Sequence, residues 1–206
     1  MRLVTAWNPS PVYTQEYVDR LRERSSVPFE VIKETRWPGW WCKMGLFDPR
    51  IKGDFLYCDL DTVITGDITE LAKAGRTMML RDFFFPQRAA SGVMFLTEES
   101  RARVWRQWIK NPCQWMQRFV GVRGGGDGAF LARVLNPRHF VQDCFPGQVC
   151  SFKVDCRQEP PPGVRMVCYH GNPRPHVTGW AVRNSSRWVQ GVPAGALKCR
   201  GQGAHA

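Results

Sequence analysis

Short blocks of apolar residues, separated by polar and turn-forming stretches, run along most of the chain. Apolar runs of about four to eight residues bounded by Gly, Pro or charged residues are typical of buried strands. They predict strands at 2–6, 29–32, 54–58, 77–80, 92–96 and 164–169. Apolar residues at helical spacing predict helices at 14–24, 98–110 and 127–135. Strands that alternate with helices predict an α/β domain built around a mostly parallel, mixed sheet flanked by helices.

Two of the predicted helices carry further signals. Thr14 precedes the first helix and is a suitable N-cap, because its hydroxyl can accept a bond from a backbone N–H of the first turn. In the helix at 98–110, Val104, Trp108 and Ile109 fall on one side. That side is the face we expect to be buried.

The length of 206 residues suits one domain with its own core, because a chain of this size buries about 70 % of its unfolded surface. We expect this domain over 1–178. Residues 179–206 are rich in Gly and small side chains and predict a basic, partly ordered tail. No apolar run approaches the roughly 18–20 residues that span a bilayer, and residues 1–10 do not resemble a signal peptide.

The eight cysteines do not form a recognisable framework. No C-x-x-C pair occurs, and a chain of this length does not need disulfides to fold. The six-residue steps between Cys144, Cys150 and Cys156 match no common zinc pattern. We therefore expect free, reduced thiols and a cytoplasmic protein.

The charge of the chain is strongly asymmetric. The net charge is +11, and the last of the 18 acidic residues is Glu159. The stretch 160–206 holds six Lys and Arg residues, at 165, 174, 183, 187, 198 and 200, and no acid. This balance favours an anionic partner: nucleotide phosphates, nucleic acid or an anionic membrane surface. A solvated Arg-rich tail with no partner is the alternative interpretation.

The most informative segment is Asp59-Leu60-Asp61, which follows the apolar run of a predicted strand and precedes a second apolar pair. Carboxylates at the carboxyl end of a strand project into the crevice where open α/β sheets bind ligands. Two hard oxygen ligands so close together can hold Mg²⁺ or Mn²⁺ and leave positions open for a diphosphate. An isolated Asp-x-Asp is common, but the apolar residues around this one set it apart from a solvated turn.

Here the segment resembles the Asp-x-Asp motif of glycosyltransferases with the GT-A fold, especially the family-eight type related to glycogenin and bacterial galactosyltransferases. Four further segments resemble elements of that family in the same order along the chain. They are the Lys-bearing helix at 40–47, the Ser-Gly-Val strand at 91–95, the helix start at 126–131 and the His-Gly element at 169–175. Each piece alone is common, and only the combination is distinctive.

The resemblance implies a single GT-A-like catalytic domain and a role for each matching residue. Asp59, Asp61 and His170 would bind the cation, Mn²⁺ or Mg²⁺. Gly171 and Arg174 would contact the donor diphosphate, and Lys43 is a further candidate for the nucleotide or phosphate region. Asp127 would face the sugar or the acceptor, and Ser91 would lie close to the donor sugar. The matching residues are Lys43, Asp59, Asp61, Ser91, Asp127, His170, Gly171 and Arg174.

The chain departs from the family pattern in three places. The spacing from His170 to Arg174 is shorter than in the best-known relatives, and Arg replaces Lys. Asp127 is followed by Gly128, where relatives have an amide, and the linker at 33–36 is short. Structural interpretations also stay open: Asp127 is a suitable helix N-cap, and a lone His170 after an apolar strand can be a structural residue. Asp82, next to Phe83, is another carboxylate near the predicted cleft, with no role beyond a candidate donor contact.

The leading hypothesis is a retaining transfer of sugar from a nucleotide-sugar donor, a UDP-sugar by resemblance, to a hydroxyl of an unidentified glycan, lipid or protein acceptor. A nucleotidyltransferase is an alternative, although Trp7-Asn8-Pro9-Ser10-Pro11 lacks the Gly-rich basic loop which that activity predicts. A basic nucleic-acid- or anion-binding protein, derived from an inactive transferase, is another. The scattered basic residues and the lack of a recognised module disfavour a nucleic-acid partner.

Overall fold

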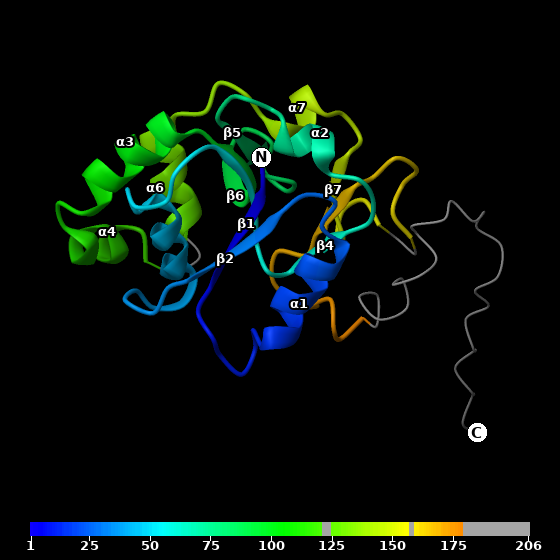
Figure 1. Cartoon of the computed structure of the whole chain (residues 1–206), viewed down its shortest axis with the longest axis horizontal. Coiled ribbons are helices and arrows are strands. Elements are labelled where there is room, and N and C mark those ends of the chain that lie inside the picture. Colours follow the sequence, from blue (N-terminus) through cyan, green and yellow to red (C-terminus); the bar gives the residue numbers. More distant parts are fainter. Residues whose placement is uncertain (121–124, 157–158, 179–206) are drawn as a thin grey trace.

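The computed structural model describes residues 1–120, 125–156 and 159–178. The predicted tail at 179–206 lies outside these described residues. Within the described part of the chain, no helix is both long enough and apolar enough to cross a membrane. The described residues form a mixed sheet with helices around it and a smaller sheet beside it (Figure 1).

The main sheet has five strands in the order β2-β1-β3-β6-β5. β1 pairs in parallel with both β2 and β3, whereas β6 pairs antiparallel with both β3 and β5. The strands are β1 (Leu3–Trp7), β2 (Phe29–Lys33), β3 (Phe55–Cys58), β5 (Met78–Arg81) and β6 (Ala89–Leu96). The α/β class with a mixed sheet flanked by helices is confirmed. The main sheet is not mostly parallel as predicted, because β6 runs antiparallel to both of its neighbours and balances the two parallel pairs.

A second sheet of three strands continues from the end of β3. Its order is β4-β8-β7, with β4 antiparallel and β7 parallel to β8. The strands are β4 (Thr62–Ile64), β7 (Val149–Ser151) and β8 (Met166–Cys168). Because β4 begins directly after Asp59–Asp61, the acidic turn lies at the junction of the two sheets.

Helices cover the sheets on both sides. Figure 1 shows α3, α4 and α6 gathered on one side of the main sheet, with β4 and β7 on the other. The helices are α1 (Gln15–Arg24), the 3-10 helix η1 (Gly39–Phe47), α2 (Thr69–Ala72), α3 (Glu98–Trp108), α4 (Pro112–Arg118), α6 (Gly126–Leu135) and α7 (Val141–Cys144).

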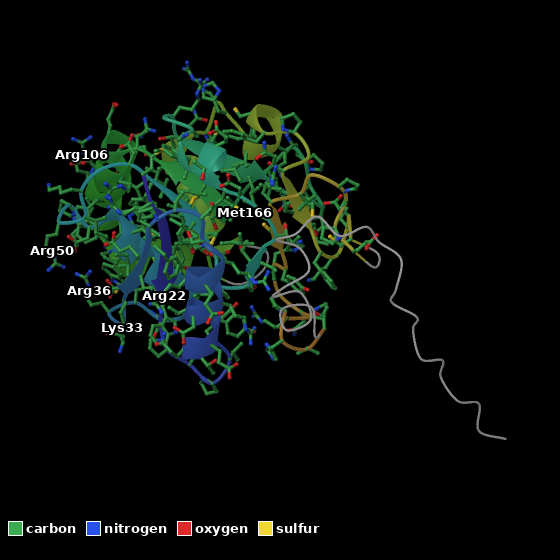
Figure 2. All side chains as sticks on the ribbon, turned by 45° about the vertical axis from the view of Figure 1, so that its right-hand side comes forward. Arg22, Lys33, Arg36, Arg50, Arg106 and Met166 are labelled. Atoms are coloured by element: carbon green, nitrogen blue, oxygen red, sulfur yellow. The ribbon has the colours of Figure 1, made fainter. Side chains whose placement is uncertain are left out.

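The core has one cluster on each face of the main sheet, because successive side chains of a strand point to opposite faces. In β3, Leu56 packs with Leu21 of α1 on one face, and Tyr57 packs with Trp108 of α3 on the other. Both faces are therefore buried, which explains why β3 is a continuous apolar run rather than an alternating one. Figure 2 shows Met166 of β8 inside the molecule, while Arg36 and Arg50 lie at its edge.

Tryptophans fill the second of these clusters. The Trp41 ring stacks on Trp108 with centroids 5.2 Å apart, and Trp37 meets Trp108 edge-on at 5.4 Å. Trp40, which lies between Trp37 and Trp41 in the sequence, is 53 % exposed. The prediction for α3 is confirmed for Val104 and Trp108 but is wrong for Ile109, which is exposed because it is the C-cap, beyond the last helical turn.

The described cysteines are free. They are Cys42, Cys58, Cys113, Cys144, Cys150, Cys156 and Cys168. The predicted N-cap of α1, Thr14, is in place, although its side chain makes no capping hydrogen bond. The N-cap of α6 is Gly125, so Asp127 lies within the first turn of that helix instead of capping it.

Candidate active site

The acidic turn is held in place by backbone bonds from both sides. The Asp59 N–H donates to Gly92 O at 2.8 Å, and the Thr62 N–H donates to Asp59 O at 3.0 Å. The hydroxyl of Thr5 in β1 donates to Cys58 O at 2.9 Å. These bonds fix the end of β3 against its two neighbouring strands, so the two carboxylates emerge from a rigid part of the sheet.

Lys43 of η1 connects Asp59 to two other predicted site residues. Its Nζ lies 2.9 Å from Asp59 Oδ1 and 2.8 Å from Asp127 Oδ2. It also donates to Ser91 Oγ at 2.9 Å, and that hydroxyl donates to Asp127 Oδ2 at 2.8 Å. Four predicted residues, from η1, from the turn after β3, from β6 and from α6, therefore form one hydrogen-bonded cluster.

The electrostatics of this cluster follow from its burial. Burial alone would lower the pKa of Lys43, but the carboxylates of Asp127 and Asp59 outweigh that effect and raise it. Lys43 is therefore an ammonium ion. Burial is also the main cause that raises the pKa of Asp59, while Lys43 opposes the rise. The hydroxyl of the buried Tyr57 donates a short hydrogen bond to Asp59 Oδ1.

Asp61 belongs to a second group, formed with the segment after β8. The Arg174 guanidinium lies 2.8 Å from Asp61 Oδ2 and 4.6 Å from the centre of the Tyr13 ring. The Tyr13 hydroxyl donates to the same oxygen at 3.3 Å. Burial and the nearby Asp59 raise the pKa of Asp61, while a backbone bond from Gly171 opposes the rise. The guanidinium beside it also favours the ionised form.

His170 bonds to Ser151, at the end of β7. Ser151 Oγ accepts from the N–H groups of Lys153 and Val154, both at 3.2 Å, and lies 2.6 Å from His170 Nε2. With both lone pairs of the hydroxyl used, its proton points at Nε2, so this network assigns Nε2 as an acceptor and Nδ1 as the protonated nitrogen. Burial and the Lys153 ammonium lower the pKa of His170, which favours the neutral ring.

The carboxylate oxygens of Asp59 and Asp61 are suitable ligands for a hard divalent cation, because Mg²⁺ and Mn²⁺ prefer carboxylate oxygen and keep several non-protein ligands. Both carboxylates are paired with basic side chains, Lys43 and Arg174. Among the described residues, no three His, Cys, Asp or Glu side chains form a group able to hold a metal ion. The His170 imidazole faces Ser151, so the predicted set of three ligands stays a prediction.

A cavity of about 830 Å³ opens beside the cluster. Its volume falls in the range of about 300–1,000 Å³ typical of small-molecule sites. Asp59, Ser91, Asp127 and His170 line it. The other predicted residues, Lys43, Asp61, Gly171 and Arg174, do not line it. The site therefore has a cavity side, around Asp59 and Asp127, and a basic side, around Asp61 and Arg174.

Sequence reasoning missed several residues of this site. Tyr57 lies two residues before Asp59, and this position next to the acidic motif is the signal that it touches Asp59. Tyr13 and Ser151 lie in unremarkable loop and strand-end positions, and nothing in the local sequence marks their contacts with Asp61 and His170. Asp82 also lines the cavity, but its Oδ1 accepts from backbone N–H groups, which is a turn-stabilising role.

Solved structures of glycosyltransferases share this fold. The apo form of the glycosyltransferase GlyE from Streptococcus pneumoniae TIGR4 superposes with a TM-score of 0.59 at 14 % identity, over 84 % of this chain and 55 % of that one. A second GlyE structure gives 0.59 at 16 % identity over the same shares. A glycosyltransferase involved in the glycosylation of the major capsid of PBCV-1 gives 0.49 at 13 % identity, over 88 % of this chain and 98 % of that one.

No protein-family model matches the chain, and no curated protein matches it either. The likeness to GlyE establishes the fold: the chain has a GT-A-like mixed α/β fold. The chain spans about half the length of the GlyE chain, at 55 %.

Proposed function

We propose that the chain is a glycosyltransferase that transfers a sugar from a nucleotide-sugar donor to an acceptor hydroxyl. One observation carries the proposal: Asp59 and Asp61, at the carboxyl end of β3, each pair with a basic side chain from a distant segment, beside a cavity of small-molecule size. The GT-A-like fold supports sugar transfer in general. Mn²⁺ or Mg²⁺ as cofactor, UDP in the donor and retention of configuration are finer proposals, which rest on the family-eight resemblance.

Arg174 is the group that we assign to the donor diphosphate. Its guanidinium is held between Tyr13 and Asp61, and a guanidinium can fork onto two phosphate oxygens. The backbone N–H of Gly171, three residues earlier, lies on the same side, where it bonds to Asp61. A divalent cation at Asp59 and Asp61 would supply the positive charge that neutralises the departing diphosphate.

The transfer itself forms a bond between the acceptor oxygen and the anomeric carbon and breaks the bond from that carbon to the diphosphate. The electron pair of the broken bond leaves with the nucleoside diphosphate, and the acceptor proton passes to the departing phosphate oxygen. Ser91 and Asp127 line the cavity beside Asp59, so they can hold sugar or acceptor hydroxyls. A front-face transfer of this kind retains configuration without a protein nucleophile.

Hydrolysis of UDP-sugars in the presence of Mn²⁺ tests the proposal without an acceptor. We expect Asp59→Ala and Asp61→Ala each to lower turnover about 100-fold, because the diphosphate loses electrostatic stabilisation as it leaves. Asp54→Ala is the matched control, since Asp54 is an exposed carboxylate at the opposite end of β3 and should keep wild-type turnover. Equal turnover in all four proteins would reject the role of the acidic turn.

A further inference from the structure

Three consecutive phenylalanines follow β5 and line the cavity. Phe84 is 54 % exposed and Phe85 is 50 % exposed. Large aromatic side chains usually lie in the core, and adjacent exposed ones beside a cavity mark a candidate binding surface. We call Phe83, Phe84 and Phe85 the aromatic wall.

The turn that carries the aromatic wall is fixed by its own hydrogen bonds. Asp82 Oδ1 accepts from the N–H groups of Phe84, at 2.8 Å, and Phe85, at 3.0 Å. The Asp82 N–H donates to Arg88 O at 2.9 Å, and the Arg88 N–H donates to Phe85 O at 2.8 Å. The Arg88 guanidinium also lies over the Phe85 ring, 4.9 Å from its centre. The backbone that presents the rings is thus ordered before any ligand arrives, which reduces the entropic cost of binding.

The aromatic wall contacts the rest of the candidate site through His170. The Phe83 ring stacks on the imidazole, with centroids 5.7 Å apart and planes at 15°. The Phe84 ring meets the imidazole edge-on at 5.4 Å. These contacts place the wall within the candidate site rather than on an unrelated surface.

The lining of the cavity is divided by chemistry. Asp59, Ser91 and Asp127 supply hydrogen-bonding groups, whereas the aromatic wall, Leu80, Phe140 and several alanines supply apolar surface. Among the described side chains that line the cavity, Asp59, Asp82 and Asp127 carry carboxylates and Arg88 carries the one positive charge. The Lys43 ammonium, which does not line the cavity, pairs with Asp59 and Asp127 from behind it. This balance disfavours an anionic occupant and suits a neutral one.

We propose that the aromatic wall is the acceptor subsite, and that it takes a neutral, hydroxyl-bearing acceptor with an apolar ring face, either a sugar ring or an aryl group. This inference rests on the proposed function, because an acceptor implies transfer. The ring face of the acceptor packs on Phe84 and Phe85, while its hydroxyl reaches the carboxylate end of the cavity. Pockets that combine an apolar lining with a few polar groups bind such molecules.

Direct binding of simple glycosides tests the subsite without any donor. The probes are phenyl β-glucoside, which carries an aryl group, and methyl β-glucoside, which carries the sugar ring alone, and binding is followed by ligand-observed NMR titration. We expect Phe84→Ala and Phe85→Ala to weaken the binding of at least one probe about three- to tenfold, because an aromatic contact is lost. If only phenyl β-glucoside binds more weakly, the aryl group packs on the wall. If both probes bind more weakly, the sugar ring does.

Two further variants make the result specific. Phe84→Tyr keeps the ring and should keep wild-type affinity, whereas Ile109→Ala removes an apolar side chain of similar exposure that does not line the cavity. Ile109→Ala should also bind both probes as wild type does. The subsite assignment is wrong if both probes bind the Phe84→Ala and Phe85→Ala proteins with unchanged affinity. It is also wrong if neither probe binds the wild-type protein or any variant. Donor hydrolysis is measured separately, so its failure would count against the proposed function instead.

Discussion

Lys43 is the residue on which the charge of the cavity side depends. Its buried ammonium lies between Asp59 and Asp127, so removing it leaves the buried Asp127 and the half-buried Asp59 without a cation. Breaking a buried ion pair in this way costs about 3–5 kcal/mol. We therefore predict that Lys43→Met lowers the free energy of unfolding by about that amount, measured by urea denaturation at pH 7.

The free energy of unfolding should also depend on pH through Lys43. Because the folded protein raises the pKa of Lys43, its contribution is fully present below the ordinary value of 10.5 and is lost as pH rises through the raised value. Lys43→Met should lack this alkaline loss. Adding Asp127→Asn to Lys43→Met should recover part of the stability, since one unpaired carboxylate is removed. A loss below about 1 kcal/mol in the single variant would contradict the buried-pair interpretation.

At the same scale, the sequence predicts the residue types of the site better than their partners. Asp59 and Asp61 are recognisable because carboxylates rarely follow a buried strand without a reason. Their partners, Lys43 and Arg174, lie 16 and 113 residues away along the chain. The motif alone therefore marks the carboxylates, but the pairing of each one with a base depends on tertiary packing.

Among the helices, α3 offers a direct test of a local signal. Thr97 is its N-cap, and the Thr97 side-chain oxygen accepts from the Ser100 N–H at 3.3 Å. Replacing such a cap by Ala costs about 1 kcal/mol. We predict that Thr97→Ala destabilises the protein by that amount in urea denaturation, while Thr97→Ser stays close to wild type. Identical midpoints for the Ala and Ser variants would show that the cap contributes nothing.

The elements that could be predicted are those with a long or strongly apolar pattern. The first strand, the helix after Thr14 and the helix at α3 lie within one or two residues of their predicted bounds. The strands β4 and β7 were not predicted, because each has three residues and forms only by pairing with β8, a distant segment. Their periodicity is too short to carry a signal.

For the molecule as a whole, the sequence predicts the class of fold but not the junction that makes the site. The acidic turn lies where the five-stranded sheet passes into the three-stranded one, and the segment after β8 returns to meet it. No local pattern encodes this return. The family resemblance led us to expect that Arg174 and Gly171 return to the acidic turn. For His170, the structure shows a bond to Ser151 that the resemblance did not imply.

The donor should stabilise the whole molecule, since Asp61 follows β3 and Arg174 follows β8. A diphosphate held by Arg174 and by a divalent cation at Asp61 would join the two sheets. A ligand at 100 times its Kd adds about 2.7 kcal/mol to the folded state. For a domain of this size, that corresponds to a rise in Tm of about 5–10 °C. We predict such a rise with UDP and Mn²⁺, measured by thermal denaturation, and its loss in Arg174→Gln.

Net charge makes a control essential to this prediction, because a chain of +11 attracts any polyanion to some extent. Arg50→Gln removes the same charge from an exposed side chain that pairs with Asp48, away from the acidic turn. If diphosphate binding is local, Arg50→Gln keeps the full rise in Tm and Arg174→Gln loses it. If the two variants lose the rise equally, the stabilisation comes from the overall field of the protein, and Arg174 has no special place in the donor site.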